Sequence, residues 1–215
     1  MKITRSLSTM QTSDFTFSRI LSYILHPLLI PTLATSALLL KPEVYTIVLP
    51  ISLITWFLSV VFVFTFVIPV TGMLILLKFN AVTSLEMNVR SERTIPLIIA
   101  STSFMVLLFQ LKSTNVPPIF LYVLYSATFA LIAGLMINLV YKISLHTLGW
   151  GAIVATLTGI SLRLGIPLLI FIIPAIILSG FAGYARLKEN AHNQAQVYLG
   201  YVAGVCVIIL ITLFE

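Results

Sequence analysis

Long stretches without a charged residue alternate with short polar segments along almost the whole chain. A helix needs about 20 apolar residues to cross roughly 30 Å of hydrocarbon, and nearly every stretch has that length. The charge-free stretches are 20–40, 44–77, 94–111, 113–141, 143–162, 164–185 and 190–214. This pattern predicts an all-α fold, a polytopic transmembrane helical bundle with six to seven spans. We expect residues 20–215 to form a single transmembrane domain behind a polar N-terminal lead, 1–19.

The composition strengthens this prediction. The chain of 215 residues is 60% hydrophobic and only 8% charged, with a mean hydropathy of +1.13. A soluble domain is about 25% charged, so the composition excludes a water-exposed globule. The polar lead and the lack of a small-residue cleavage pattern predict that there is no cleavable signal peptide. The single cysteine, Cys206, is expected to be a small core residue of the last span.

Prolines are expected to interrupt the first two spans. Pro27 and Pro31 predict a kink in the first half of 20–40, and His26 is expected to bond a backbone carbonyl that the kink frees. The stretch 44–77 would be about 50 Å long as a helix, well beyond the thickness of the hydrocarbon layer. We count it as one crossing, which must tilt, overshoot or break, and its natural break is 69–72, Pro-Val-Thr-Gly.

Seven crossings bring the polar segments to one side of the membrane. Two spans separate each polar segment from the next, so four segments share a face: the N-terminal lead, 78–93, 141–146 and 185–196. This face has nine cations, Lys2, Arg5, Arg19, Lys78, Arg90, Arg93, Lys142, Arg186 and Lys188, and the opposite face has Lys41, Lys112 and Arg163. The positive-inside rule then predicts that the shared face is cytoplasmic. The net charge of +6 favours anionic lipid headgroups over nucleic acid as a partner, because the cations form no continuous basic stripe.

Two histidines lie on this predicted face, where apolar spans meet polar sequence. His146 ends the segment 142–146, Lys-Ile-Ser-Leu-His, and His192 follows Arg186 by six positions. Imidazole can attack as a nucleophile and transfer protons near neutral pH, and a guanidinium group is a fork-shaped ligand for phosphate. These residue types at such junctions indicate phosphate chemistry at a membrane surface.

The C-terminal half of the chain resembles the type 2 phosphatidate phosphatase superfamily. The pattern Arg186-x5-His192-x3-Gln196 resembles the third motif of that family, Ser-Arg-x5-His-x3-Asp, and the segment 142–146 is similar to the second, Pro-Ser-Gly-His. The first motif, Lys-x6-Arg-Pro, has its nearest counterpart in 90–96, Arg-Ser-Glu-Arg-Thr-Ile-Pro. Departures are Ala185 for serine, Gln196 for aspartate, and Ile143 and Leu145 for the proline and glycine of the second motif.

The resemblance implies a metal-independent membrane lipid phosphatase that hydrolyses a lipid phosphomonoester or pyrophosphate through a phosphohistidine. It implies no metal and no cofactor, a lipid phosphate as substrate, and an integral, multi-pass location, expected to be a bacterial inner membrane. His192 would be the nucleophile, His146 the acid and base, and Gln196 the residue that orients His192. The groups that would bind phosphate are Arg186, Arg93, Arg90, Ser144 and Lys142.

Several alternatives stay open at the level of sequence. An amide at Gln196 can orient an imidazole but cannot stabilise its charge as a carboxylate does, so Glu189, three positions before His192, is a second candidate orienter. The chain could instead be a catalytically decayed lipid-phosphate-binding membrane protein or assembly subunit. A small transporter or flippase ranks behind both. Arg90 and Arg93 fit a lipid-contacting loop equally well, and Lys142 fits a side chain that snorkels from a span end.

Overall fold

The structure is a computed structural model that describes residues 17–44, 49–85, 87 and 89–214. Its long helices are α2 (Ile30–Leu39), α3 (Ile51–Phe62), α4 (Ile68–Lys78), α5 (Thr94–Lys112), α6 (Pro118–Asn138), α7 (Leu145–Leu164), α8 (Leu169–Lys188) and α9 (Gln194–Phe214). The described residues contain no strand. Most of the polar lead, 1–19, lies outside the described residues.

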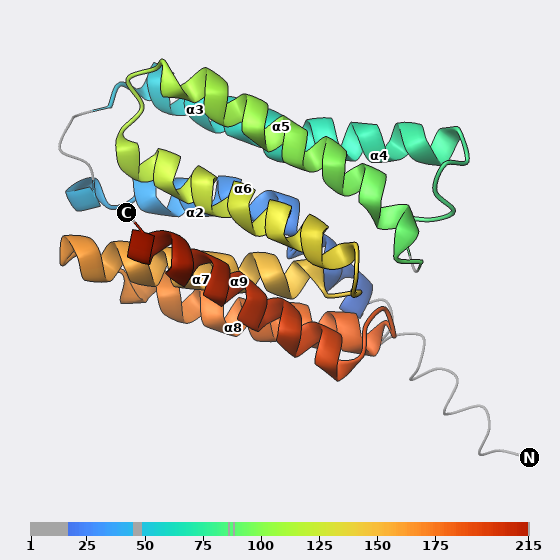
Figure 1. The fold of residues 1–215 in the computed structure, drawn as a ribbon. Coiled ribbons are helices and arrows are strands. Elements are labelled where there is room, and N and C mark those ends of the chain that lie inside the picture. Colours follow the sequence, from blue (N-terminus) through green and yellow to red (C-terminus); the bar gives the residue numbers. More distant parts are fainter. Residues whose placement is uncertain (1–16, 45–48, 86, 88, 215) are drawn as a thin grey trace, which may run out of the picture.

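The helices form the predicted polytopic bundle. Six helical segments are long and apolar enough to cross a membrane: Phe17–Leu39, Ile51–Lys78, Ser91–Lys112, Pro118–Asn138, Leu145–Leu164 and Leu169–Lys188. A shorter apolar segment, Gln194–Leu210, follows in α9. The helices run roughly along one common direction, and successive helices are joined at the two ends of the bundle (Figure 1).

The first span is interrupted where its prolines predict. Helical residues 17–24 are followed by a 3-10 turn, η1 (Pro27–Leu29), and then by α2. The side chain of His26 caps this turn, because its Nδ1 accepts a hydrogen bond from the backbone N–H of Leu28 at 3.3 Å. The kink is therefore confirmed, but the expected bond from His26 to a backbone carbonyl is wrong. A helix start leaves N–H groups without partners, so the ring is needed as an acceptor.

The second span stays helical and bends through a π-helical turn instead of breaking at 69–72. This turn, η3 (Val63–Val67), joins α3 to α4. Within it, Ile68 N–H bonds the carbonyl of Val63, and Pro69 has no N–H to offer to Phe64. The hydroxyl of Ser103 on α5 donates to that carbonyl at 2.6 Å. A partner from a neighbouring helix thus satisfies the backbone group that the proline leaves open, as an apolar surrounding requires.

Helix α7 packs against α6, α8, α9 and the first span, and its backbone comes very close to that of α9. Glycines permit this approach: a Cβ at Gly200 would lie 2.6 Å from the carbonyl oxygen of Ser144, and one at Gly204 would overlap the carbonyl of Leu148. Gly151 of α7 faces the carbonyl of Tyr201 in the same way. Gly200 and Gly204 are four apart, the small-xxx-small spacing that lets membrane helices pack closely.

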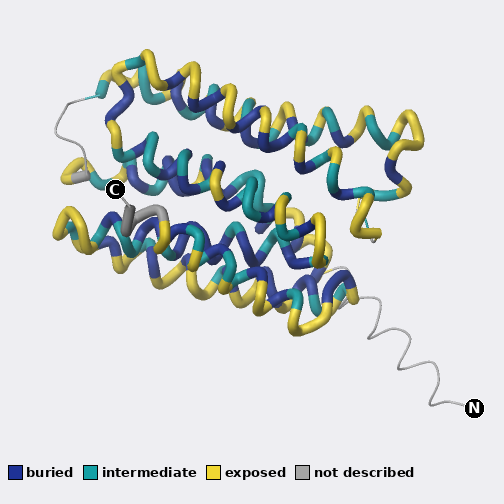
Figure 2. The backbone as a smooth tube through the Cα atoms, in the orientation of Figure 1, coloured by how far each residue is buried: buried dark blue, intermediate teal, exposed yellow. Residues whose placement is uncertain are grey.

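The outer surface of the bundle is apolar, as a bilayer requires. Figure 2 shows buried positions turned toward the middle of the bundle and exposed positions turned outward. Large hydrophobic side chains are among the most exposed, with Phe109 81% and Leu162 80% accessible. Cys206 also lies on this surface, so its predicted place in the core is wrong. In α9 Gly200 and Gly204 are buried, whereas Cys206, two positions after Gly204, lies on an outward face.

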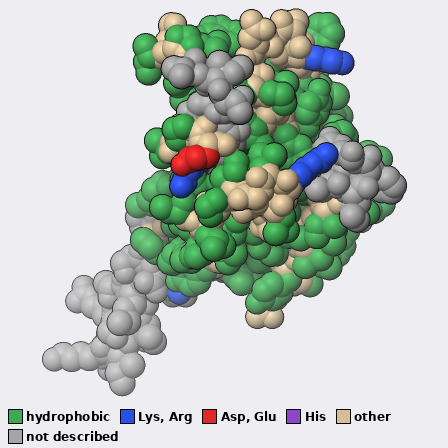
Figure 3. Space-filling view, turned by 90° about the vertical axis from the view of Figure 1, so that its left-hand side faces the viewer, with side chains coloured by type: hydrophobic (Ala, Val, Ile, Leu, Met, Phe, Trp, Pro, Cys, Tyr) green, Lys and Arg blue, Asp and Glu red, His purple; other side chains and the backbone are tan. Residues whose placement is uncertain are grey.

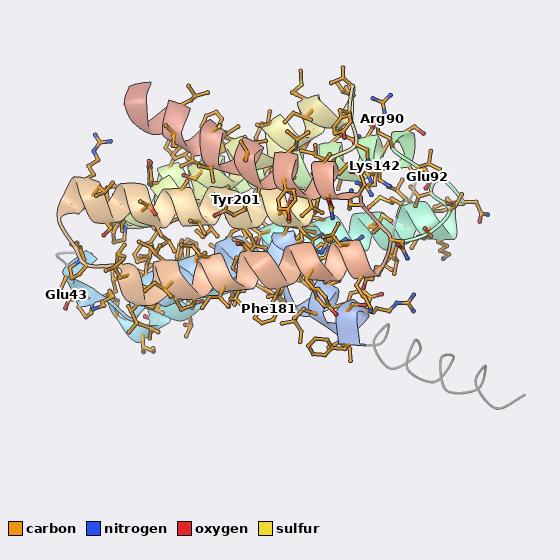
Figure 4. The ribbon with its side chains drawn as sticks, turned by 90° about the horizontal axis from the view of Figure 1, so that it is seen from below. Glu43, Arg90, Glu92, Lys142, Phe181 and Tyr201 are labelled. Carbon is orange, nitrogen blue, oxygen red and sulfur yellow. The ribbon has the colours of Figure 1, made fainter. Side chains whose placement is uncertain are left out.

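The polar segments separate between the two ends of the bundle. Arg90, Glu92 and Lys142 lie at one end and Glu43 at the other (Figure 4). The described residues of loop 79–90 share the first end with loops 139–144 and 189–193 (Figure 1), as predicted from the spacing of the spans. Figure 3 faces the second end, where a few separate charged side chains stand among hydrophobic ones. We refer to the first end as the site end.

We expect Gly204→Ala to destabilise the fold, because its new methyl group would overlap the backbone of α7. Overpacking of this kind costs about 1–3 kcal/mol, which lowers the midpoint of thermal unfolding in detergent. Gly180→Ala on α8 is the matched control, since a Cβ there meets nothing within 4 Å. Equal midpoints for both variants would contradict the close α7–α9 contact.

Candidate functional site

The bundle contains a cavity of about 680 Å³, and four of the predicted site residues line it. Arg93 reaches it from the start of α5, His146 from the first turn of α7, Arg186 from the last turn of α8, and His192 from the α8–α9 loop. These residues come from three separate polar segments. The predicted convergence of those segments at one end therefore brings two imidazoles and two guanidinium groups to one cavity.

The imidazole of His192 is buried, and Gln196 fixes its orientation. The Nδ1 atom lies 2.9 Å from Oε1 of Gln196. That oxygen also accepts from the backbone N–H of Asn193 at 3.4 Å, while Oδ1 of Asn193 accepts from the backbone N–H of Gln196 at 2.9 Å. The two residues form a capping box at the start of α9. Because Asn193 N–H identifies the amide oxygen as the acceptor, Nδ1 of His192 carries the proton and Nε2 carries the lone pair.

Arg93 lies on the other side of this ring and is itself 4% exposed. Its Nη1 lies 3.4 Å from Nε2 of His192 and donates to the carbonyl of Ile143 at 3.3 Å. Its Nε donates to the carbonyl of Met87 at 2.9 Å. One guanidinium group thereby connects the loop before α5, the loop before α7 and the α8–α9 loop, and it holds a positive charge beside the lone pair of His192.

Burial lowers the pKa of His192 to about 3, and the charge of Arg93 acts in the same direction. The ring is therefore neutral at pH 7, the form that a nucleophile requires. The unfolded chain takes up this proton at the ordinary pKa of 6.5, whereas the folded chain takes it up only near 3. His192 consequently reduces the stability of the fold as the pH falls from 6.5 toward 3.

Arg186 forms the second cationic part of the cavity, and it is paired with Glu189. Its Nη1 donates to Oε2 of Glu189 at 2.7 Å and to the hydroxyl of Ser22 at 3.3 Å. The Ser22 hydroxyl donates in turn to the same carboxylate oxygen at 3.1 Å. Glu189 therefore orients Arg186. The residue that orients His192 is Gln196, and the alternative that Glu189 orients His192 is wrong.

His146 is held by the first helix. Its Nε2 donates to the backbone carbonyl of Ser22 at 3.1 Å, so in the neutral ring Nδ1 is the acceptor. The ring also makes an edge-to-face contact with His26, at a centroid distance of 5.3 Å and an interplanar angle of 77°. His146 thus has one nitrogen committed to the fold and one nitrogen suited to proton transfer.

Three predicted phosphate ligands do not line this cavity. Arg90 is exposed and its Nη1 donates to the carbonyl of Leu139 at 2.6 Å. Ser144 is fully buried, and its hydroxyl caps α7 by accepting from the N–H of Thr147. Lys142 is half-buried; burial first, and then the charges of Arg93 and Arg186, lower its pKa. Arg90 and Ser144 therefore serve the local structure of the loops that carry Arg93 and His146.

The first span adds lining residues that the sequence did not predict as site residues. Arg19, Ser22 and His26 line the cavity from this span. Ser22 lies 164 positions from Arg186, and no local pattern signals such a contact. The pair Arg186 and Glu189 does have a signal, because opposite charges three residues apart on a helix face one another.

The lining combines one polar region with a larger apolar one. The polar region has the cations Arg93 and Arg186 and the neutral imidazole of His192, a set that suits an anion next to a nucleophile. In the described part of the chain, no three His, Cys, Asp or Glu side chains come together as ligands for a metal ion.

Comparisons with protein-family models, with curated proteins and with solved structures give no match to this chain.

We expect the His192 ring to be neutral at pH 5, because burial and Arg93 oppose its protonation. The measurement is a titration of ring chemical shifts in histidine-labelled protein in micelles, with His192→Gln to assign the signal. Gln196→Glu should raise the pKa of His192, since a carboxylate beside Nδ1 stabilises the imidazolium form. Gln196→Leu, which removes the acceptor, should not. Titration of the wild-type ring near 6.5 would rule out this geometry.

Proposed function

We propose that this protein is a metal-independent membrane lipid phosphatase that hydrolyses a lipid phosphomonoester or pyrophosphate through a phosphohistidine intermediate. The observation that carries the proposal is the position of the neutral His192 ring. Its Nε2, which has the lone pair, lies 3.4 Å from Nη1 of Arg93, and the ring lines the same cavity as Arg186 and His146. The resemblance of 142–146 and 186–196 to the type 2 phosphatidate phosphatases agrees with it. Candidate substrates are phosphatidate, phosphatidylglycerophosphate, polyprenyl pyrophosphate and lipid A phosphate.

The first step is attack of His192 Nε2 on phosphorus. As the N–P bond forms, the P–O bond to the leaving alcohol or phosphate breaks, and Nδ1 of His146 passes to the leaving oxygen a proton that it has accepted from the monoanionic phosphate of the substrate. The Nδ1 proton of His192 stays on its hydrogen bond to Gln196. Arg93 and Arg186 neutralise the equatorial oxygens of the in-line transition state.

The second step releases phosphate. Water attacks the phosphohistidine in line with the P–N bond, and Nδ1 of His146 accepts the proton that the water loses. The P–N bond breaks, its electron pair returns to Nε2 of His192, and inorganic phosphate leaves. His146 passes this proton to the departing phosphate, so each imidazole returns to its neutral starting state.

The apolar part of the cavity supports a lipid as the substrate. Its lining extends along α5 from Arg93 to Phe104 and along α7 from Leu145 to Thr156. Eleven residues of helix rise about 16 Å, which is roughly half the thickness of the hydrocarbon layer. An amphiphile with its phosphate at the cations and its chain along this lining would match the cavity in length and polarity.

The site end is proposed to face the cytoplasm. Seven cations of the described residues belong to its segments, against three at the other end: Arg19, Lys78, Arg90, Arg93, Lys142, Arg186 and Lys188 against Lys41, Lys112 and Arg163. The positive-inside rule favours this orientation. The assignment to a bacterial inner membrane rests on the resemblance alone.

A specific observation also favours a second candidate, a decayed enzyme that binds lipid phosphates or acts as an assembly subunit. Gln196 orients His192 through a neutral oxygen and adds no charge to stabilise the imidazolium-like nucleophile. In serine proteases, the change from Asp to Asn at the orienting position costs about 10⁴ in rate. The two candidates share the same anion site and differ only in turnover.

We expect His192→Asn to lower phosphate release from a panel of lipid phosphates by at least about 10³-fold, because the nucleophile is lost. The assay contains EDTA and uses inorganic phosphate as the readout. Lys78→Gln, which changes an exposed cation at the site end, is the matched control and should retain turnover. Equal rates for wild type and His192→Asn would refute the phosphohistidine mechanism.

Gln196→Glu separates the two candidates. In an active phosphatase we expect it to increase an already measurable rate by about 10-fold, since a carboxylate at Nδ1 stabilises the charge that His192 acquires. Phosphate release that appears only in Gln196→Glu, with none from the wild type, would identify a decayed enzyme.

A further inference from the structure

Glu189 is an unexpected residue to find in an anion-binding cavity. Its side chain is only 10% exposed and it lines the same cavity as Arg93, Arg186 and His192. A carboxylate repels a phosphate nearby, and burying a charge is costly unless the charge is paired. The pairing with Arg186 offsets part of that cost, but it also reduces the positive charge that Arg186 offers to phosphate. A second role for the carboxylate would explain why it is retained here.

The two oxygens of this carboxylate have different surroundings. Arg186 Nη1 at 2.7 Å and the Ser22 hydroxyl at 3.1 Å both donate to Oε2. Oε1 is buried, and none of the described residues donates a hydrogen bond to it. An arginine clamp alone would favour the bidentate arrangement, in which each oxygen receives one N–H. Here both lone pairs of Oε1 stay available to a donor that the described chain does not supply.

A role for Oε1 toward His192 does not account for this asymmetry. Nδ1 of His192 is bonded to Gln196, whose amide oxygen the capping box with Asn193 fixes in place. A protonated Glu189 does not account for it either, because the 2.7 Å contact with Arg186 is typical of an ionised carboxylate. A donor on a molecule that enters the cavity would account for it, because the described residues supply none.

We propose that Oε1 of Glu189 accepts a hydrogen bond from a hydroxyl or ammonium group on the headgroup of the substrate, next to the scissile phosphate. Because Arg186 contacts both Glu189 and the proposed phosphate position, this donor lies within a few bonds of the phosphate. The cavity then selects lipid phosphates whose headgroup has a donor beside the phosphate over those whose only polar group is the phosphate. This inference rests on the proposed function and narrows its substrate class.

Such a contact has a large effect on specificity. A site that is built to bond a substrate hydroxyl rejects the analogue without it, because a buried polar group of the protein is then left without a partner. With one orphaned oxygen, we expect a preference of about 10- to 100-fold in kcat/KM. An acyl chain or a phosphate group alone cannot produce this preference, since both are the same in the two analogues.

The experiment compares phosphatidylglycerophosphate with its O-methyl ether, in which the glycerol hydroxyl is blocked, in micelles of the full-length protein. A third lipid with an amino group in place of the hydroxyl separates the two kinds of donor. We expect the wild type to prefer the hydroxyl and amino lipids over the ether by about 10- to 100-fold. Glu189→Gln should bring the ratio close to one, because its amide oxygen pairs with Arg186 and its NH₂ replaces the acceptor Oε1.

Ser22→Ala is the matched control, because it removes a donor to Oε2 and leaves Oε1 unchanged. It should retain the preference, even where the overall rate falls. An equal ratio in the wild type and in Glu189→Gln would overturn the proposal, whatever the absolute rates. This ratio is independent of losses of folded protein, which affect all three lipids alike.

Failure of the proposed function gives a different result. If no lipid is hydrolysed and His192→Asn equals the wild type, the phosphatase proposal fails, and the same three lipids are compared by equilibrium binding. A preference in affinity that Glu189→Gln removes would still support the donor subsite. Equal affinities of the three lipids for the wild type would overturn it.

Discussion

The close approach of α7 and α9 is the contact on which the rest of the site depends. Without a Cβ at Gly200 and Gly204, the two backbones come near enough for hydrogen bonds between them. Ser144 N–H donates to the carbonyl of Gln196 at 3.0 Å, and the Thr147 hydroxyl donates to the carbonyl of Val197 at 2.9 Å. These bonds join the segment that carries His146 directly to the helix that orients His192.

Hydrogen bonds to backbone carbonyls position most of the polar groups around this contact. Arg93 donates to two loop carbonyls, His146 to the carbonyl of Ser22, and Trp150 to the carbonyl of Leu25 at 3.1 Å. In an apolar surrounding, interrupted helices and loops leave carbonyls that water cannot satisfy. The same bonds that meet this requirement also fix the side chains around the cavity, so the stability of the fold and the arrangement of the site have a common origin.

The capping box at the start of α9 shows how a neutral amide can replace a carboxylate in orientation, though not in charge. Asn193 and Gln196 satisfy backbone N–H groups at the helix start, and the oxygen thus fixed determines which nitrogen of His192 has the proton. Burial, and after it the charge of Arg93, lowers the pKa of His192, so the ring is neutral without a carboxylate beside it. Arg186, in contrast, has its carboxylate partner in Glu189.

Several features of this protein were predictable from sequence, because they depend on local chemistry, on the length of apolar stretches and on the number of spans between polar segments. Apolar stretches of about 20 residues predict the spans, and Pro27 predicts the break in the first one. The even number of spans between polar segments brings 90–93, 142–146 and 186–196 to one end. The spacing Arg186-x5-His192-x3-Gln196 identifies the pair His192 and Gln196, since residues four apart on a helix face one another.

The other features depend on contacts between distant segments, so only the tertiary structure shows them. It selected Arg93 over Arg90 for the cavity, committed Ser144 to a helix cap, and placed Ser22 against Arg186 and Glu189. It also kept the second span helical at Pro69, because Ser103 of another helix satisfies the carbonyl of Phe64. Periodicity and motif spacing describe one segment at a time. Which side chain completes the hydrogen bonds of another segment follows only from how the helices pack, and between α7 and α9 the backbone approach at Gly200 and Gly204 sets that packing.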